Sequence, residues 1–204
     1  MISGLLSISR LIDAVNRYAG IVANWLVLLA ALVCALDAFL SYALRSLLVI
    51  GDRMGPSGAV FNSLFALYRD NSNTLRDLQL VMFAGMVMLG AAWTLKLNEH
   101  VRVDLFYTWV GDRTRIWIDL SGGLLFLVPF CLVMLYFSWP WFLESWNGDE
   151  LAQNAGGLPR WPVKLFLPLG FALLLLQGLS EIIKCIAALT TDYRREHAYE
   201  KPVQ

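Results

Sequence analysis

Four long apolar runs dominate this chain, and each is long enough to cross a bilayer as a helix. A spanning helix needs about 20 mostly apolar residues. The segments between the runs are too short to form a separate catalytic domain. We therefore expect one all-α membrane domain over residues 1–204, with four transmembrane helices. The four runs cover residues 18–40, 78–97, 117–139 and 165–189.

A water-soluble helical bundle is the alternative, and composition argues against it. Hydrophobic residues make up 58% of the chain and its mean hydropathy is +0.58, whereas soluble domains are about 45–50% apolar. A soluble bundle also needs polar stripes at helical spacing. The stretch Leu124–Phe137 has none, which is typical of a helix surrounded by lipid or by other apolar helices.

The first apolar run is expected to remain as an anchor, because it is longer than the roughly 7–15-residue apolar core of a signal peptide. The three cysteines, Cys34, Cys131 and Cys185, all lie within apolar runs and show no CxxC spacing. We interpret them as packing residues and expect no disulfide framework.

Two short amphipathic helices are expected at the membrane surface. In residues 5–16, apolar side chains recur every three or four positions and polar ones take the other face, which favours a helix lying in the interface. A plain extension of the first span is the alternative. Residues 58–69 show a similar pattern, and residues 190–204 form a polar tail. Asp37 lies about one turn from the end of the first run, and Arg45 is expected to pair with it or to reach the headgroups.

Basic residues in short loops predict the orientation, because they favour the cytoplasmic side. The side that carries both termini has the larger share, so we expect both termini in the cytoplasm. Its basic residues are Arg10, Arg17, Lys96, Arg102, Arg113, Arg115, Lys184, Arg194, Arg195 and Lys201. The opposite side carries Arg45, Arg53, Arg69, Arg76, Arg160 and Lys164.

Several function classes are disfavoured by what the sequence lacks. The 16 basic and 16 acidic residues balance, so no nucleic-acid surface is indicated. His100 and His197 lie outside the apolar runs, which disfavours haem held between spanning helices. Hydrolase motifs are missing, and Glu144, Asp149 and Glu150 are read as a solvated loop. We expect no enzyme activity, catalytic residue, metal or cofactor.

A solitary carrier is also disfavoured. Charged residues inside a membrane usually mark a transport path, but Asp37, Glu181 and Lys184 all lie near the ends of their runs. Glu181 and Lys184 are three positions apart and are expected to pair. The glycine-broken short segments of an ion and substrate site are not evident. A membrane-embedded partner subunit remains, with a stand-alone four-helix channel or an orphan membrane interaction protein as alternatives.

Several motifs, taken in order, carry a family resemblance. They are Gly90–Lys96 running into Asn98–Asp104, then Glu144-Ser145, then Asn154–Lys164 with Pro168–Phe171, and finally Leu176-Gln177-Gly178. Together they resemble the small membrane subunit, DctQ-like, of tripartite ATP-independent periplasmic (TRAP) transporters, and the resemblance runs from Tyr18 to Leu189.

The resemblance implies a small permease subunit in the bacterial inner membrane. Its implied partners are a large TRAP membrane subunit, a periplasmic substrate-binding protein and the phospholipid bilayer, and it implies a static scaffold beside a moving large subunit. Transport would be driven by an ion gradient, and the cargo would be an organic acid, with a dicarboxylate or 2-oxo acid favoured. No substrate-binding residue is expected in this chain.

The resemblance also implies candidate residues for the subunit interface or scaffold, and helix contact through Gly85, Gly90, Ala91 and Ala92. The interface candidates are Glu99, His100, Arg102, Asp104, Glu144, Ser145, Gly156, Gly157, Pro159, Trp161, Pro162, Lys164 and Pro168.

Overall fold

The computed structural model describes residues 2–54, 59–98, 110–153 and 157–191, and their regular elements are helices. Four helical rods, each a continuous run of helix, are long and apolar enough to span a membrane. They confirm the all-α, four-span fold of a multi-pass membrane protein. In chain order the elements are α1 (Ile2–Met54), α2 (Ala59–Leu97), α4 (Asp112–Gly122), the π-helical turn η2 (Gly123–Leu127), α5 (Val128–Asn147) and α6 (Trp161–Thr190).

A proline coincides with the π-helical irregularity of the third rod. Neither α1 nor α2 contains a proline, and they continue for 53 and 39 residues. The third rod, formed by α4, η2 and α5, has Pro129 in the first turn of α5, directly after η2. Proline lacks an N–H and its ring crowds the carbonyl four residues earlier, and a wider π turn relieves that crowding. The sequence therefore places an irregularity at this point of the rod.

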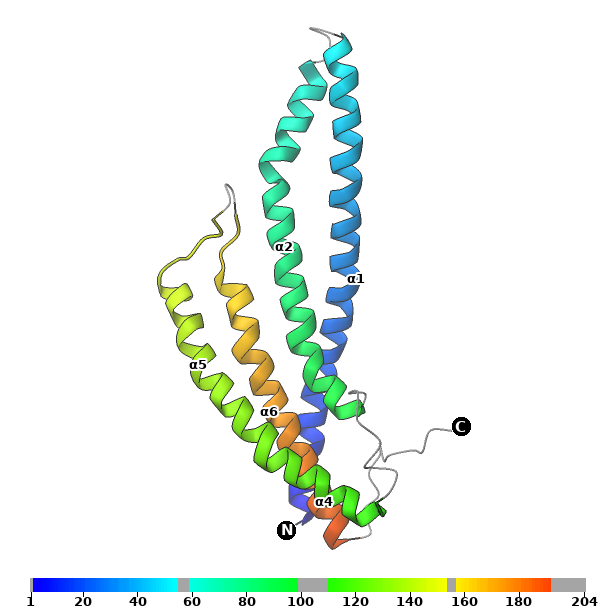
Figure 1. Cartoon of the computed structure of the whole chain (residues 1–204), viewed down its shortest axis with the longest axis vertical. Coiled ribbons are helices and arrows are strands. Elements are labelled where there is room, and N and C mark those ends of the chain that lie inside the picture. Colours follow the sequence, from blue (N-terminus) through cyan, green and yellow to red (C-terminus); the bar gives the residue numbers. More distant parts are fainter. Residues whose placement is uncertain (1, 55–58, 99–109, 154–156, 192–204) are drawn as a thin grey trace, which may run out of the picture.

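The helix α6 lies between the other rods and packs against α1, α2 and α5 (Figure 1). Gly170 lets α6 approach α2 closely, because a Cβ at this position would lie 2.8 Å from the backbone oxygen of Met88. Gly85 of α2 likewise lets α1 and α6 approach α2 closely, because a Cβ at this position would meet Leu26 of α1 and Phe166 of α6. Close backbone approach through small residues is typical of membrane helix packing. The core at this crossing consists of Ala23, Leu89, Ala92 and Leu173, with Ala19, Leu26 and Phe166 against it.

The structure differs from the sequence-based expectation for residues 5–16. These residues form the beginning of α1 and are not a separate surface helix. Their polar face is buried against α6, and their apolar residues, such as Ile8 and Leu11, are exposed on the outside. An amphipathic pattern shows which residues share a face, but in a membrane protein the apolar face is free to meet lipid. Likewise, the described part of residues 58–69 belongs to the long helix α2.

The helices α1 and α2 are longer than a bilayer requires. At 1.5 Å per residue α1 is about 80 Å long, whereas a bilayer with its headgroups measures about 40–45 Å. Figure 1 shows the α1–α2 hairpin rising past the connection between α5 and α6. We call residues 37–54 of α1 with residues 59–76 of α2 the arm. Of the two alternatives for Arg45, pairing with Asp37 is not what the structure shows: Tyr68 Oη donates to Asp37 Oδ1 at 2.8 Å.

Candidate functional site

A buried polar network joins α1 to α6. The amide Nδ2 of Asn16 donates to Oε1 of Gln177 at 2.7 Å, and Nε2 of Gln177 donates to Oδ1 of Asp13 at 3.1 Å. The hydroxyl of Ser180 donates to the same Asp13 oxygen at 2.9 Å and lies 2.7 Å from the hydroxyl of Ser9. Asn16 and Gln177 are both 0% exposed. Each of these bonds ties residues more than 160 positions apart in the chain.

The end of this network is charged. Nζ of Lys184 lies 2.8 Å from Oδ2 of Asp13 and 2.8 Å from Oε1 of Glu181. Gln177 also donates to Glu181, at 3.0 Å. The expected pairing of Glu181 with Lys184 is confirmed, and the structure adds Asp13 as a second carboxylate. Because a buried charge without a partner is costly, these groups favour the α1–α6 arrangement over one in which the helices separate.

Two polar stripes in the sequence are the signal for this network. Polar residues occur at spacings of three or four positions in two otherwise apolar helices: Ser9, Asp13 and Asn16 in α1, and Gln177, Ser180, Glu181 and Lys184 in α6. Two such stripes bury each other when the helices pack side by side. The stripe in α1 is compatible with a helix in the membrane interface, but the structure buries it against α6.

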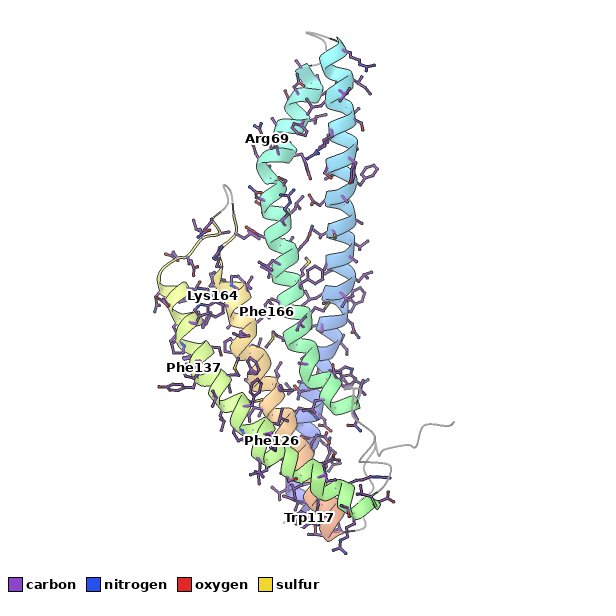
Figure 2. The ribbon with its side chains drawn as sticks, viewed as in Figure 1. Arg69, Trp117, Phe126, Phe137, Lys164 and Phe166 are labelled. Atoms are coloured by element: carbon purple, nitrogen blue, oxygen red, sulfur yellow. The ribbon has the colours of Figure 1, made fainter. Side chains whose placement is uncertain are left out.

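A second cluster connects the end of α5 to the start of α6. Glu150 pairs with Lys164, and its Oε1 lies 3.6 Å from Nη1 of Arg160. Nζ of Lys164 also stands over the ring of Trp141, 4.7 Å from its centroid. The hydrogen bond from Lys164, with the charges of Lys164 and Arg160, holds the pKa of Glu150 below its usual value of 4.5. Figure 2 shows Lys164 near the beginning of α6.

Backbone contacts and tryptophans hold the same connection in place. Leu151 and Pro159 form an isolated antiparallel bridge, and the rings of Trp146 and Trp161 meet edge to face at 4.8 Å between centroids. The N–H of Leu158 donates to Oδ2 of Asp77 at 3.1 Å, which joins this connection to α2. We call residues 141–153 and 157–164 with Asp77 the loop cluster. Tryptophans at span ends are typical of the membrane interface.

The structure brings together several of the sequence-predicted residues in the loop cluster. Ser145 is buried, Glu144 is exposed with its carbonyl accepting the N–H of Gly148, and Pro162 lies in the first turn of α6. Gly157 is partly buried beside the bridge. Pro168 is buried one turn beyond Lys164 in α6. The remaining candidates, Glu99, His100, Arg102, Asp104 and Gly156, lie outside the described residues.

No group of three His, Cys, Asp or Glu side chains that could hold a metal occurs within the described ranges. The two clusters therefore consist of hydrogen bonds, ion pairs and aromatic contacts between helices. Such arrangements fix the positions of helices, and they supply neither a nucleophile with its base nor a ligand set. The geometry defines a multi-pass membrane protein in which α6 is bonded to α1 at one end. At the other end, the connection between α5 and α6 is bonded to α2 through Asp77 and to α6 through Lys164.

Residues 59–188 match a family model described as the DctQ component of tripartite ATP-independent periplasmic transporters. This match covers more than half of the chain, and the chain belongs to the DctQ family. It is a small subunit of a TRAP transporter, a transporter component and not an enzyme. The motif-based resemblance is thereby confirmed.

A similarity to a human protein, anoctamin-8, was also found. The two are 29% identical over 178 residues, which cover 70% of this chain and 14% of anoctamin-8. The chain thus spans a small part of that protein's length. No solved structure matches the chain.

Proposed function

We propose that this chain is the static scaffold subunit that holds the large membrane subunit of a TRAP transporter. The transporter would use an ion gradient to take up organic acids, of the dicarboxylate or 2-oxo acid kind, delivered by a periplasmic binding protein. The observation that carries the scaffold role is the buried network from Asn16 to Lys184, which ties the first spanning helix to the last.

Rigidity supports this role. A subunit that holds a moving partner must resist sliding between its own helices. The α1–α6 network makes sliding costly, because any displacement leaves buried amides and carboxylates without partners. The close approach of Gly170 to Met88 limits movement between α6 and α2. The Asp77–Leu158 bond fixes the opposite end.

The outer surface supports a membrane partner. The third rod packs mainly against α6, and much of its remaining surface is apolar and exposed. Phe126 and Phe137 both stand out from this rod in Figure 2. A large membrane subunit or lipid can cover such a surface. We propose that the charged stretch of residues 99–104 and the loop cluster contribute further contacts to the large subunit.

The distribution of basic residues supports the proposed orientation in a bacterial inner membrane. The N-terminus, the end of α2 and the end of α6 lie at the same end of the molecule in Figure 1. This end carries Arg10, Arg17, Lys96 and Lys184. Positive residues favour the cytoplasm, so both termini are proposed to be cytoplasmic.

The test is affinity purification of the tagged chain from its native membrane in mild detergent. The proposal expects one large polytopic membrane protein in equal amount, and expects transport in liposomes only when that protein and the binding protein are both present. Recovery of the chain alone, together with ion conduction by the chain alone in liposomes, would instead establish a stand-alone four-helix channel.

A further inference from the structure

A proline lies inside α6 on the face that this helix turns toward α5. Two contacts mark that face: Nζ of Lys164 stands over the ring of Trp141, and the ring of Phe171 meets that of Phe130 edge to face at 5.8 Å between centroids. Pro168 is buried in the interior of α6, four residues after Lys164 and three before Phe171. Residues at these spacings share one face of a helix, so Pro168 lies between the two contacts.

The proline leaves one backbone carbonyl of α6 without its helical donor. In an α-helix the N–H at position 168 donates to the carbonyl of Lys164, but proline has no N–H. A polar backbone group inside a membrane is costly when it has no hydrogen bond. In transmembrane helices, carbonyls freed by proline are satisfied by serine or threonine side chains of a neighbouring helix, or by ordered water.

The helix α5 brings a hydroxyl to the same place. It runs antiparallel to α6 and packs mainly against it (Figure 1). Ser138 is 4% exposed and lies between Phe130 and Trp141 in the sequence, the two α5 residues that contact α6 on either side of Pro168. The hydroxyl of Ser138 is therefore buried between the two helices, at the level of the proline.

This hydroxyl makes no hydrogen bond to any residue that the structure describes. Other helical serines bond a carbonyl of their own helix, as Ser46 does with Tyr42 and Ser63 with Ala59. A buried hydroxyl without a partner costs free energy. The structure thus places an unpaired hydroxyl opposite a carbonyl that lacks its helical donor, and the two are not bonded to each other directly.

We propose that an ordered water molecule bridges the hydroxyl of Ser138 and the carbonyl of Lys164, and so joins α5 to α6 inside the membrane. Water suits both groups, because it donates one hydrogen to the carbonyl and exchanges a hydrogen bond with the hydroxyl. A cation such as Ca²⁺ would need at least about six oxygen ligands, and an anion would be repelled by the carbonyl. The proposal concerns the contact between two helices of this chain and is independent of the scaffold role.

A structure of the full chain, purified from its native membrane at a resolution that shows ordered water, tests the proposal directly. The expected result is one density peak about 2.7–3.2 Å from both Oγ of Ser138 and the carbonyl oxygen of Lys164. A dry contact without a peak would overturn the proposal. So would a hydroxyl of Ser138 that bonds the carbonyl of Lys164 directly.

A double-mutant cycle tests the link between hydroxyl and carbonyl in solution. Ser138→Ala should raise the unfolding equilibrium constant in detergent about fivefold, because the bridging water loses a partner. Pro168→Ala restores an N–H that satisfies the carbonyl of Lys164 within α6, so adding Ser138→Ala to this variant should have little further effect.

The matched control for the cycle is Ser121→Ala. Ser121 is an exposed serine of α4 whose hydroxyl bonds the carbonyl of Ile118 in its own helix. Its replacement should have the same effect with Pro168 present or replaced. If Ser138→Ala also had the same effect in both backgrounds, the hydroxyl would not be coupled to the carbonyl and the bridge would be refuted.

Discussion

Asn16 and Gln177 hold the first and last spanning helices together, with Nδ2 of Asn16 donating to Oε1 of Gln177 at 2.7 Å. Both side chains are 0% exposed. Gln177 uses its own Nε2 to reach Asp13 and Glu181, so one amide connects α1 to the charged end of the network.

Replacing Gln177 with Leu should destabilise the protein by about 1–3 kcal/mol, because the buried Asn16 amide and the Asp13 carboxylate each lose one hydrogen-bond partner. Unfolding in detergent micelles with added denaturant measures the change. The control is Gln153→Leu, the same substitution at an exposed position, which should have little effect. Equal stability of the two variants would show that the network does not hold α1 to α6.

Gly170→Ala should destabilise the protein by about 1–3 kcal/mol, because the new Cβ meets the backbone of Met88 and forces α2 and α6 apart. The control is Gly122→Ala in α4, where a Cβ has open space around it and Ala is the better helix former. Differential scanning fluorimetry in detergent compares them. A Gly170→Ala variant as stable as the Gly122→Ala variant would contradict the close α2–α6 contact.

The sequence predicted the fold well because each span is a continuous apolar run, and this signal depends only on composition and length. The fourth predicted span, residues 165–189, lies within α6 (Trp161–Thr190), and the second ends with α2 at Leu97. The continuity of α1 and α2 beyond the bilayer was not predicted. The amphipathic pattern of residues 58–69 predicts a short surface helix, whereas their described part belongs to α2, which pairs with α1 there.

Acidification should weaken the contribution of Glu150 to stability. Its pKa is lowered in the folded protein by Lys164 and Arg160, so this contribution is full above the usual pKa of 4.5 and is lost as the pH falls through the lower folded value. The difference in thermal midpoint between the wild type and Glu150→Gln should therefore be largest near neutral pH and shrink below pH 4.5.

The matched control for this pH series is Glu144→Gln, a neighbouring exposed carboxylate whose side chain makes no ion pair within the part of the chain that the structure describes. Its difference from wild type should stay small at every pH. If Glu150→Gln showed an equally flat profile, the Glu150–Lys164 pair would not stabilise the loop cluster.

Tyr68→Phe should loosen the arm without unfolding the body. The substitution removes the hydroxyl that donates to Asp37, at a cost of about 0.5–1.5 kcal/mol for a typical hydrogen bond. Amide hydrogen exchange should become faster in the arm and stay unchanged in α6. Tyr136→Phe, which removes an exposed hydroxyl from α5, is the control. Unaltered exchange in the arm would mean that this bond does not hold its helices together.

The candidate sites were predicted unevenly, for a physical reason. Lys164 and Trp161 belong to a local motif, and a local motif can be recognised because its residues are contiguous in the sequence. The partners that define the α1–α6 network lie more than 160 positions apart, and the sequence shows two polar stripes without showing that they meet. The amphipathic pattern of residues 5–16 favours a helix in the membrane interface, because the sequence does not show that a second polar stripe covers Asp13.

The central claim is that this chain stays rigid while its partner moves, and a crosslink between α1 and α6 tests it most directly. The hydroxyls of Ser9 and Ser180 are 2.7 Å apart, so cysteines at both positions can form a disulfide once Cys34, Cys131 and Cys185 have been replaced. Uptake by the reconstituted transporter is then measured in the oxidised and the reduced state. The scaffold account predicts equal uptake in both states. Uptake that is abolished by oxidation and restored by reduction would contradict it, because α1 and α6 would then have to move during transport.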